Sequence, residues 1–79
     1  MEVFVKAHAT IKELISDFPD KGALIVHLPE QATLLDLLKV LGLSAEKVTL
    51  VVINGTCVYT APALNQGDLV EFFPYMAGG

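Results

Sequence analysis

Few residues in this chain of 79 could do chemistry on their own. There is one cysteine, Cys57, and there are two histidines, His8 and His27, far apart in the sequence. Because a zinc site needs about four such ligands at close spacing, no metal site is predicted. No glycine-rich loop leads from a strand into a helix, and no acidic residues are spaced as a general acid/base pair. The sequence therefore indicates no self-sufficient enzyme and no cofactor bound by the chain itself.

The chemically distinctive segment is the end, Pro-Tyr-Met-Ala-Gly-Gly over residues 74–79. Gly78 and Gly79 lack side chains, so they can pass through a narrow channel and adopt backbone angles closed to other residues. The carboxylate of Gly79 is unhindered, so it could attack ATP to form an acyl-adenylate that is open to a sulfur nucleophile. Six extended residues reach at most about 20 Å, enough to enter a cleft of another protein. A terminal Gly-Gly also fits an inert tail.

The composition predicts one small globular domain in the cytoplasm. Hydrophobic residues make up 53% of the chain, which suits a dense core. No apolar run approaches the ~18 residues of a membrane span, and no basic-then-apolar export signal opens the sequence. A single cysteine fits a reducing compartment.

Charge argues against nucleic acid as a partner. The net charge is −4, and all five basic residues are scattered lysines. Without arginine, the chain has no fork-shaped donor for bidentate phosphate contacts. We therefore expect protein partners, with no nucleic acid and no membrane.

The first half of the chain predicts two strands, a helical turn and one clear helix. Alternation over residues 3–7 and the apolar run 23–28 predict strands. Between them, Ile11, Leu14, Ile15 and Phe18 have helical spacing and predict a short helix or a helical turn, ended by Pro19. Residues 33–42 predict the main helix. It has an N-cap at Thr33, a capping-box-like Asp36 and a buried stripe of leucines (Leu34, Leu37, Leu38 and Leu41), and it ends at Gly42.

The second half predicts three strands, over residues 48–53, 56–59 and 69–73. Asn54-Gly55 is the preferred pair for a two-residue hairpin turn, which places Val52 opposite Cys57. The fold class is therefore α+β, a mixed sheet of about five strands packed on one main helix. We expect a domain over residues 1–73 and a flexible tail over residues 74–79.

Residues 67–79, Gly-Asp-Leu-Val-Glu-Phe-Phe-Pro-Tyr-Met-Ala-Gly-Gly, resemble the end of the ubiquitin-like sulfur carriers. The small subunit of molybdopterin synthase is the nearest match, and the thiamine-biosynthesis carrier is also similar. The resemblance extends over the opening strand, the capped helix and the Asn54 hairpin, and it implies a β-grasp fold. A departure is Tyr75-Met76, where a second proline and a smaller aliphatic residue are typical.

This resemblance implies a cycle of activation and sulfur transfer. An E1-like enzyme would consume ATP to adenylate Gly79, and a cysteine desulfurase or a rhodanese-type donor would supply sulfur to leave a thiocarboxylate. The large subunit of molybdopterin synthase would complete the active site and pass the sulfur to a pterin precursor.

Alternation in the last strand predicts a docking face. Glu71 should face water together with Leu69 and Phe73, while Val70 and Phe72 enter the core. Aligned with the family, His8, Cys57 and Phe73 lie on the outer face of the sheet. We predict that the partner-binding residues are His8, Cys57, Phe73, Pro74, Tyr75, Met76 and Ala77.

Three alternatives stay open from the sequence. The carrier could serve thiamine synthesis, cysteine synthesis or tRNA thiolation. A ubiquitin-like modifier would share the chemistry up to the adenylate and end bonded to a lysine. A pure interaction domain would have an inert tail.

Overall fold

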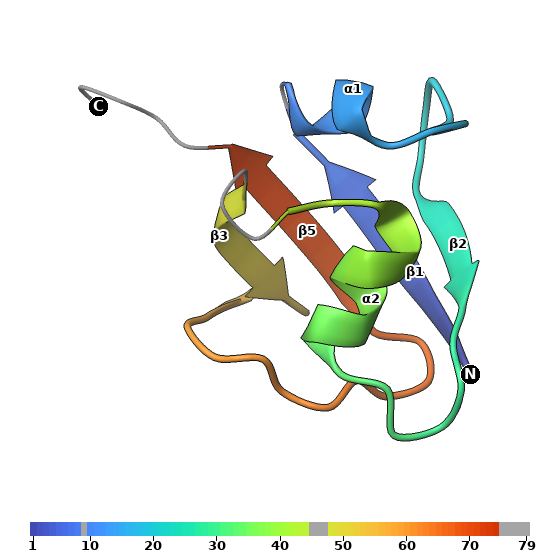
Figure 1. Ribbon diagram of the computed structural model, residues 1–79, viewed down its shortest axis with the longest axis vertical. Helices are drawn as coiled ribbons and strands as arrows, with labels where there is room; N and C mark the ends of the chain where they lie inside the picture. The colour runs from blue at the N-terminus through green and yellow to red at the C-terminus, as the bar shows by residue number, and fades with distance from the viewer. Residues whose placement is uncertain (9, 45–47, 75–79) are drawn as a thin grey trace.

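The computed structural model describes residues 1–8, 10–44 and 48–74, which form one mixed sheet crossed by a helix. In chain order the elements are β1 (Glu2–Ala7), α1 (Ile11–Leu14), β2 (Leu24–His27), α2 (Leu34–Leu41), β3 (Val48–Ile53), β4 (Thr56–Val58) and β5 (Leu69–Pro74). The strand order is β2-β1-β5-β3-β4, and β1 runs parallel to β5 while the other neighbours are antiparallel. Figure 1 shows α2 lying across one face of the sheet.

The core lies between α2 and that face. In β1, Val3 and Val5 are fully buried, whereas the residues between and after them are not. In β5, Val70 and Phe72 are fully buried in the same way. The helix contributes a set of buried leucines, Leu34, Leu37 and Leu38. One sheet face and one helix stripe thus bury each other, which confirms the predicted α+β class with five strands on one main helix.

The first helix is a single turn, the shorter of the two forms that its sequence pattern predicts. It ends at Leu14, and the next residue, Ile15, is already extended, with φ −104° and ψ 121°. Leu14 is 47% exposed, although it belongs to the predicted apolar stripe. Ile15 is buried because the extended backbone, rather than helical spacing, turns it inward. Helical spacing therefore holds for one turn, and of the four residues Leu14 is exposed while the other three are buried or packed against the core.

Strand ends differ from the predicted ends by one residue. β2 covers residues 24–27 instead of 23–28, and β4 stops at Val58 instead of Tyr59. β5 includes Pro74, which we had expected to stop the strand after Phe73. Pro74 pairs with Val48 at the end of the β3–β5 ladder. Differences of this size are usual at element termini.

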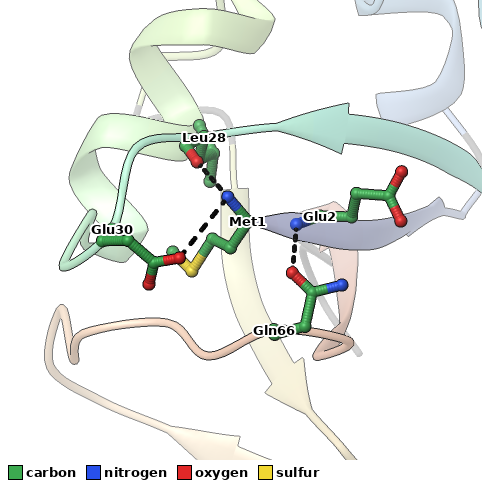
Figure 2. Close-up of polar contacts among 5 residues, drawn as sticks. All are labelled: Met1, Glu2, Leu28, Glu30 and Gln66. Atoms are coloured by element: carbon green, nitrogen blue, oxygen red, sulfur yellow. Dashed lines mark hydrogen bonds and ion pairs between the residues drawn. The ribbon is translucent and has the colours of Figure 1, made fainter.

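Contacts of the first two residues fix β1 between its neighbours (Figure 2). The Met1 nitrogen donates to the Leu28 carbonyl at 2.6 Å and lies 4.0 Å from a Glu30 carboxylate oxygen. The Glu2 N–H donates to Gln66 Oε1 at 2.8 Å. The start of β1 is therefore tied both to the end of β2 and to the loop that precedes β5.

The β3–β4 turn is held to the start of β5. Asn54 has a positive φ of 51°, as a type I′ turn requires, and Gly55 follows with φ 84°. The Asn54 amide group donates to Asp68 Oδ1 and accepts from the Leu69 N–H, each at 2.9 Å. The hairpin predicted from Asn54-Gly55 is confirmed, and these bonds set its position against the central strand.

The main helix begins with a complete capping box. The Thr33 N–H donates to Asp36 Oδ2 at 2.8 Å, and the Asp36 N–H donates to Thr33 Oγ1 at 3.4 Å. At the other end Gly42 is left-handed, with φ 72°, and its N–H donates to the carbonyls of Leu38 and Lys39. Both predicted helix signals are confirmed.

Thr33→Ala is expected to lower the free energy of unfolding by about 1 kcal/mol, because the Asp36 N–H loses its acceptor. Urea denaturation followed by circular dichroism measures this change. Thr10→Ala is the matched control, since Thr10 precedes α1 without a side-chain cap bond, and its effect should stay within about 0.5 kcal/mol. Equal losses in the two variants would contradict a cap at Thr33.

Asp36 makes the same helix start sensitive to acid. Hydrogen bonds from the Thr33 N–H and hydroxyl, with a smaller effect of Lys39, lower the pKa of Asp36 below its ordinary 3.8. A carboxyl with a lowered folded-state pKa stabilises the fold above its unfolded pKa, and this contribution is lost as the pH falls through the folded pKa. Asp36→Asn should therefore be less stable than the parent at neutral pH, and the difference should shrink as the pH falls below the ordinary pKa and disappear below the lowered folded-state pKa. A difference that persists in strong acid would contradict this cause.

Candidate docking face and carrier end

The outer face is the side of the sheet turned away from α2. Along β5, Leu69, Glu71 and Phe73 are half-buried, in alternation with the buried Val70 and Phe72. The predicted alternation of the last strand is thus confirmed. Because α2 covers the other side, Phe73 presents its ring on the uncovered side of the central strand.

His8 and Phe73 meet on this face. Their rings stack with centroids 4.2 Å apart and planes inclined by 4°. Ala7 pairs with Phe72 in the parallel register of β1 and β5, so the residues that follow them, His8 and Phe73, lie side by side. The His8 N–H donates to the Phe72 carbonyl at 3.0 Å. Two of the predicted docking residues are therefore in direct contact.

Glu71 fixes the imidazole of His8. Its Oε2 lies 3.0 Å from His8 Nε2, and since a carboxylate only accepts, Nε2 carries the hydrogen. The stacked ring and this bond hold the His8 side chain in one orientation against Phe73. The alternation of β5 predicts only that Glu71 faces water, and it gives no sign of this contact. The parallel pairing of β1 with β5, which places Lys6 beside Glu71, is the signal that could have found it.

Cys57 shares the face but lies farther away. Val52 pairs with Cys57 on one side and with Glu71 on the other, so the three residues form a row across β4, β3 and β5. The predicted pairing of Val52 with Cys57 is confirmed. The thiol is exposed, and one strand separates it from β5. The structure thus brings His8 and Phe73 together and leaves Cys57 at the β4 edge of the same face.

Apolar residues that the sequence analysis did not single out extend this surface. Phe4 pairs with Leu69, and Leu50 pairs with Phe73, so all four lie on the outer face together with Val52. Each is half-buried. The outer face therefore carries a band of apolar side chains, which is typical of the central part of a protein–protein interface.

The predicted carrier end begins where the described residues stop. Pro74 is half-buried and is held by its pairing with Val48. The other predicted tail residues lie outside the described residues: Tyr75, Met76, Ala77, Gly78 and Gly79. Their roles stay predictions. The described residues end with Pro74, which is also the end of the central strand β5.

Two further observations concern chemistry and location. Within residues 1–8, 10–44 and 48–74, no three His, Cys, Asp or Glu side chains are grouped as metal ligands would be. Over the same part of the chain, no helix has the length and apolar character needed to cross a bilayer.

A five-stranded mixed sheet, with the first and last strands parallel at its centre and one main helix across it, is the β-grasp fold of the ubiquitin-like proteins. The sequence model of the ThiS family matches residues 15–79, so the chain belongs to the ThiS family of sulfur carriers. This confirms both the predicted fold and the resemblance to sulfur carriers. No match was found among the curated proteins.

Membership in this family defines a role. Its members are small carrier proteins rather than catalysts, and they act with E1-like adenylating enzymes and with synthase partners. The match begins at residue 15, so β1 and α1 lie outside it.

Proposed function

We propose that this protein carries sulfur as a thiocarboxylate on Gly79. The observation that carries the proposal is an unhindered Gly78-Gly79 end that follows the central strand in a chain of the ThiS family. Residues 75–79 follow the end of β5 at Pro74, and in this proposal the reacting carbon is that of Gly79, beyond the described domain. The domain serves recognition, and the end of the chain serves chemistry.

The proposed activation takes three steps. The Gly79 carboxylate attacks the α-phosphorus of ATP on the E1-like enzyme, and pyrophosphate leaves. A persulfide sulfur from a cysteine desulfurase or a rhodanese-type donor then attacks the acyl carbon, and AMP leaves. A thiol reduces the resulting acyl disulfide, which leaves the thiocarboxylate. A side chain at position 79 would crowd both attacks at the acyl group, and glycine avoids this.

The outer face is the proposed docking surface for the partner that completes the active site. Phe73 is the candidate anchor because an aromatic side chain beside the tail can fill a partner pocket. His8 stacks on one face of the Phe73 ring and is held by Glu71, which reduces the freedom that docking would remove. Cys57, Pro74, Tyr75, Met76 and Ala77 complete the proposed contact set.

The large subunit of molybdopterin synthase is the partner that we favour, with a pterin precursor as sulfur acceptor. Support comes from the Phe-Phe-Pro and Ala-Gly-Gly sequence at residues 72–79 and from the segment between β1 and β2. That segment is part of the core, since Ile11 and Ile15 are buried at 1% and 6% exposure. Thiamine-pathway carriers are usually more compact there. The alternative acceptor is the thiamine pathway, because the matching family model is that of ThiS.

Intact-mass measurement after incubation with the E1-like enzyme, ATP and a sulfur donor tests the proposal. We expect the protein to gain the mass difference between sulfur and oxygen, and we expect deletion of Gly79 to abolish this gain completely. An unchanged mass with an enzyme shown to be active on another carrier would contradict it. Adducts linked to lysines of other proteins, without a thiocarboxylate, would instead identify a protein modifier.

A further inference from the structure

A groove lies between β2 and α2, on the side of the sheet that α2 covers. It has a volume of about 510 Å³, with Leu24 on the strand side and Val40 and Leu41 on the helix side. Ile15 lines the same groove from the end of α1. Val40 is 61% exposed although it is apolar, so the helix wall offers a hydrophobic surface that the domain itself does not use.

The groove runs beside a free sheet edge. β2 pairs with β1, and within the described part of the chain no strand pairs with its other side. The Leu28 N–H donates to the Met1 carbonyl at 2.8 Å, and the Met1 nitrogen donates back to the Leu28 carbonyl (Figure 2). Met1 and Leu28 thus form a hydrogen-bonded pair of this antiparallel ladder.

Alternation from that pair shows which backbone groups are unpaired. Glu2 opposite His27 and Phe4 opposite Ile25 must be non-hydrogen-bonded pairs. The N–H and C=O groups of Ile25 and His27 therefore point away from β1 toward the free edge. An extended peptide laid along this edge would find donors and acceptors at the spacing of a strand.

The charge of the lining favours an acidic occupant. Lys39 is the positively charged residue among those that line the groove, and no Asp or Glu in the described structure lines it, although the whole chain has a net charge of −4. His27 lines the groove through its backbone, because its pairing with Glu2 directs its side chain to the outer face, where it lies 3.8 Å from the Glu2 carboxylate. Lys39 forms no salt bridge to another residue that the structure describes. Its ammonium group is thus available to a carboxylate in the groove.

We propose that this groove binds an extended segment of a partner protein in which apolar residues adjoin an aspartate or a glutamate. The segment adds a strand to β2 through Ile25 and His27. Its side chains directed toward α2 enter the groove between Leu24 and Val40, and its carboxylate pairs with Lys39. The site goes beyond the proposed function, because it lets a partner hold the domain while the outer face stays free.

Selection from a phage-displayed library of short random peptides, followed by fluorescence anisotropy with a labelled synthetic copy of the enriched peptide, tests the proposal. We expect enrichment of β-branched residues next to Asp or Glu. Val40→Asp should weaken binding at least about tenfold, and Lys39→Glu about threefold to fivefold. Leu35→Asp is the matched control, since Leu35 is 52% exposed on the same helix but does not line the groove, and it should bind as the parent does.

Hydrogen exchange gives an independent result. The amides of Ile25 and His27 should gain protection when the peptide binds, while those of Leu24 and Val26, already bonded to β1, should change little. A selection without enrichment, peptides unaffected by Val40→Asp, or binding insensitive to Lys39→Glu would overturn the proposal. Protection of the same amides by dimerisation of the protein alone would overturn it as well, because the occupant would then be a second copy.

Discussion

Phe72→Ala is expected to lower the free energy of unfolding by about 3–5 kcal/mol, enough to unfold much of a small domain at ambient temperature. Phe72 is fully buried and is one of the largest fully buried side chains in the described structure. It lies on the central strand, where β1 and β3 fix the backbone on both sides and limit collapse around a cavity. Urea denaturation monitored by circular dichroism measures the loss.

Phe72→Leu is the control for this prediction. Leucine keeps an apolar side chain in the same place and leaves a smaller cavity, so its loss should be clearly smaller than that of alanine. A Phe72→Ala variant within about 1 kcal/mol of the parent would contradict a core position for this ring.

Phe73→Asp is expected to weaken binding to the large synthase subunit by at least about thirtyfold while the domain stays folded. The half-buried Phe73 side chain lies on the outer face and stacks on His8 there. The substitution removes the proposed anchor, breaks the stack and places a second carboxylate on the Glu71 side of the strand. Isothermal titration calorimetry with the purified subunit measures the change.

Two further variants separate docking from general damage. His8→Ala removes the stacked ring and the partner of Glu71 but leaves Phe73, so we expect a smaller loss than for Phe73→Asp. Leu35→Asp places the same charge on α2, on the opposite side of the sheet from the outer face, and this variant should bind normally. Normal binding by a folded Phe73→Asp variant would contradict the docking face proposed above.

Local sequence patterns predicted those parts of the fold that local forces determine. The alternation around Glu71 assigned Phe72 to the core and Phe73 to the other face, because successive side chains of a strand point in opposite directions. Thr33 and Gly42 marked the limits of the main helix, since each satisfies backbone groups within a few residues. Asn54-Gly55 set the register of the hairpin for the same reason.

Contacts between distant segments could not be read in this way. The bond between His8 and Glu71 joins residues 63 positions apart and depends on the parallel pairing of β1 with β5. The groove beside β2 depends on which strand lies at the edge, and strand order has no local signal. The length of α1 could not be read locally either. Leu14 and Ile15 both have helical spacing, but the helix ends at Leu14, and Ile15 is buried from an extended backbone.

The central place of the last strand also bears on how the chain folds during synthesis. β1 and β2 emerge from the ribosome first, yet β1 lacks its parallel neighbour until β5 follows. Half of the sheet core described above, Val70 and Phe72, is contributed by that strand. Because such long-range pairings must form before their contacts stabilise the chain, we expect one late, cooperative folding step rather than growth from the N-terminus. Until β5 is complete, the leucine stripe of α2 has only a partial surface to cover it, and this nascent chain is the form most exposed to aggregation.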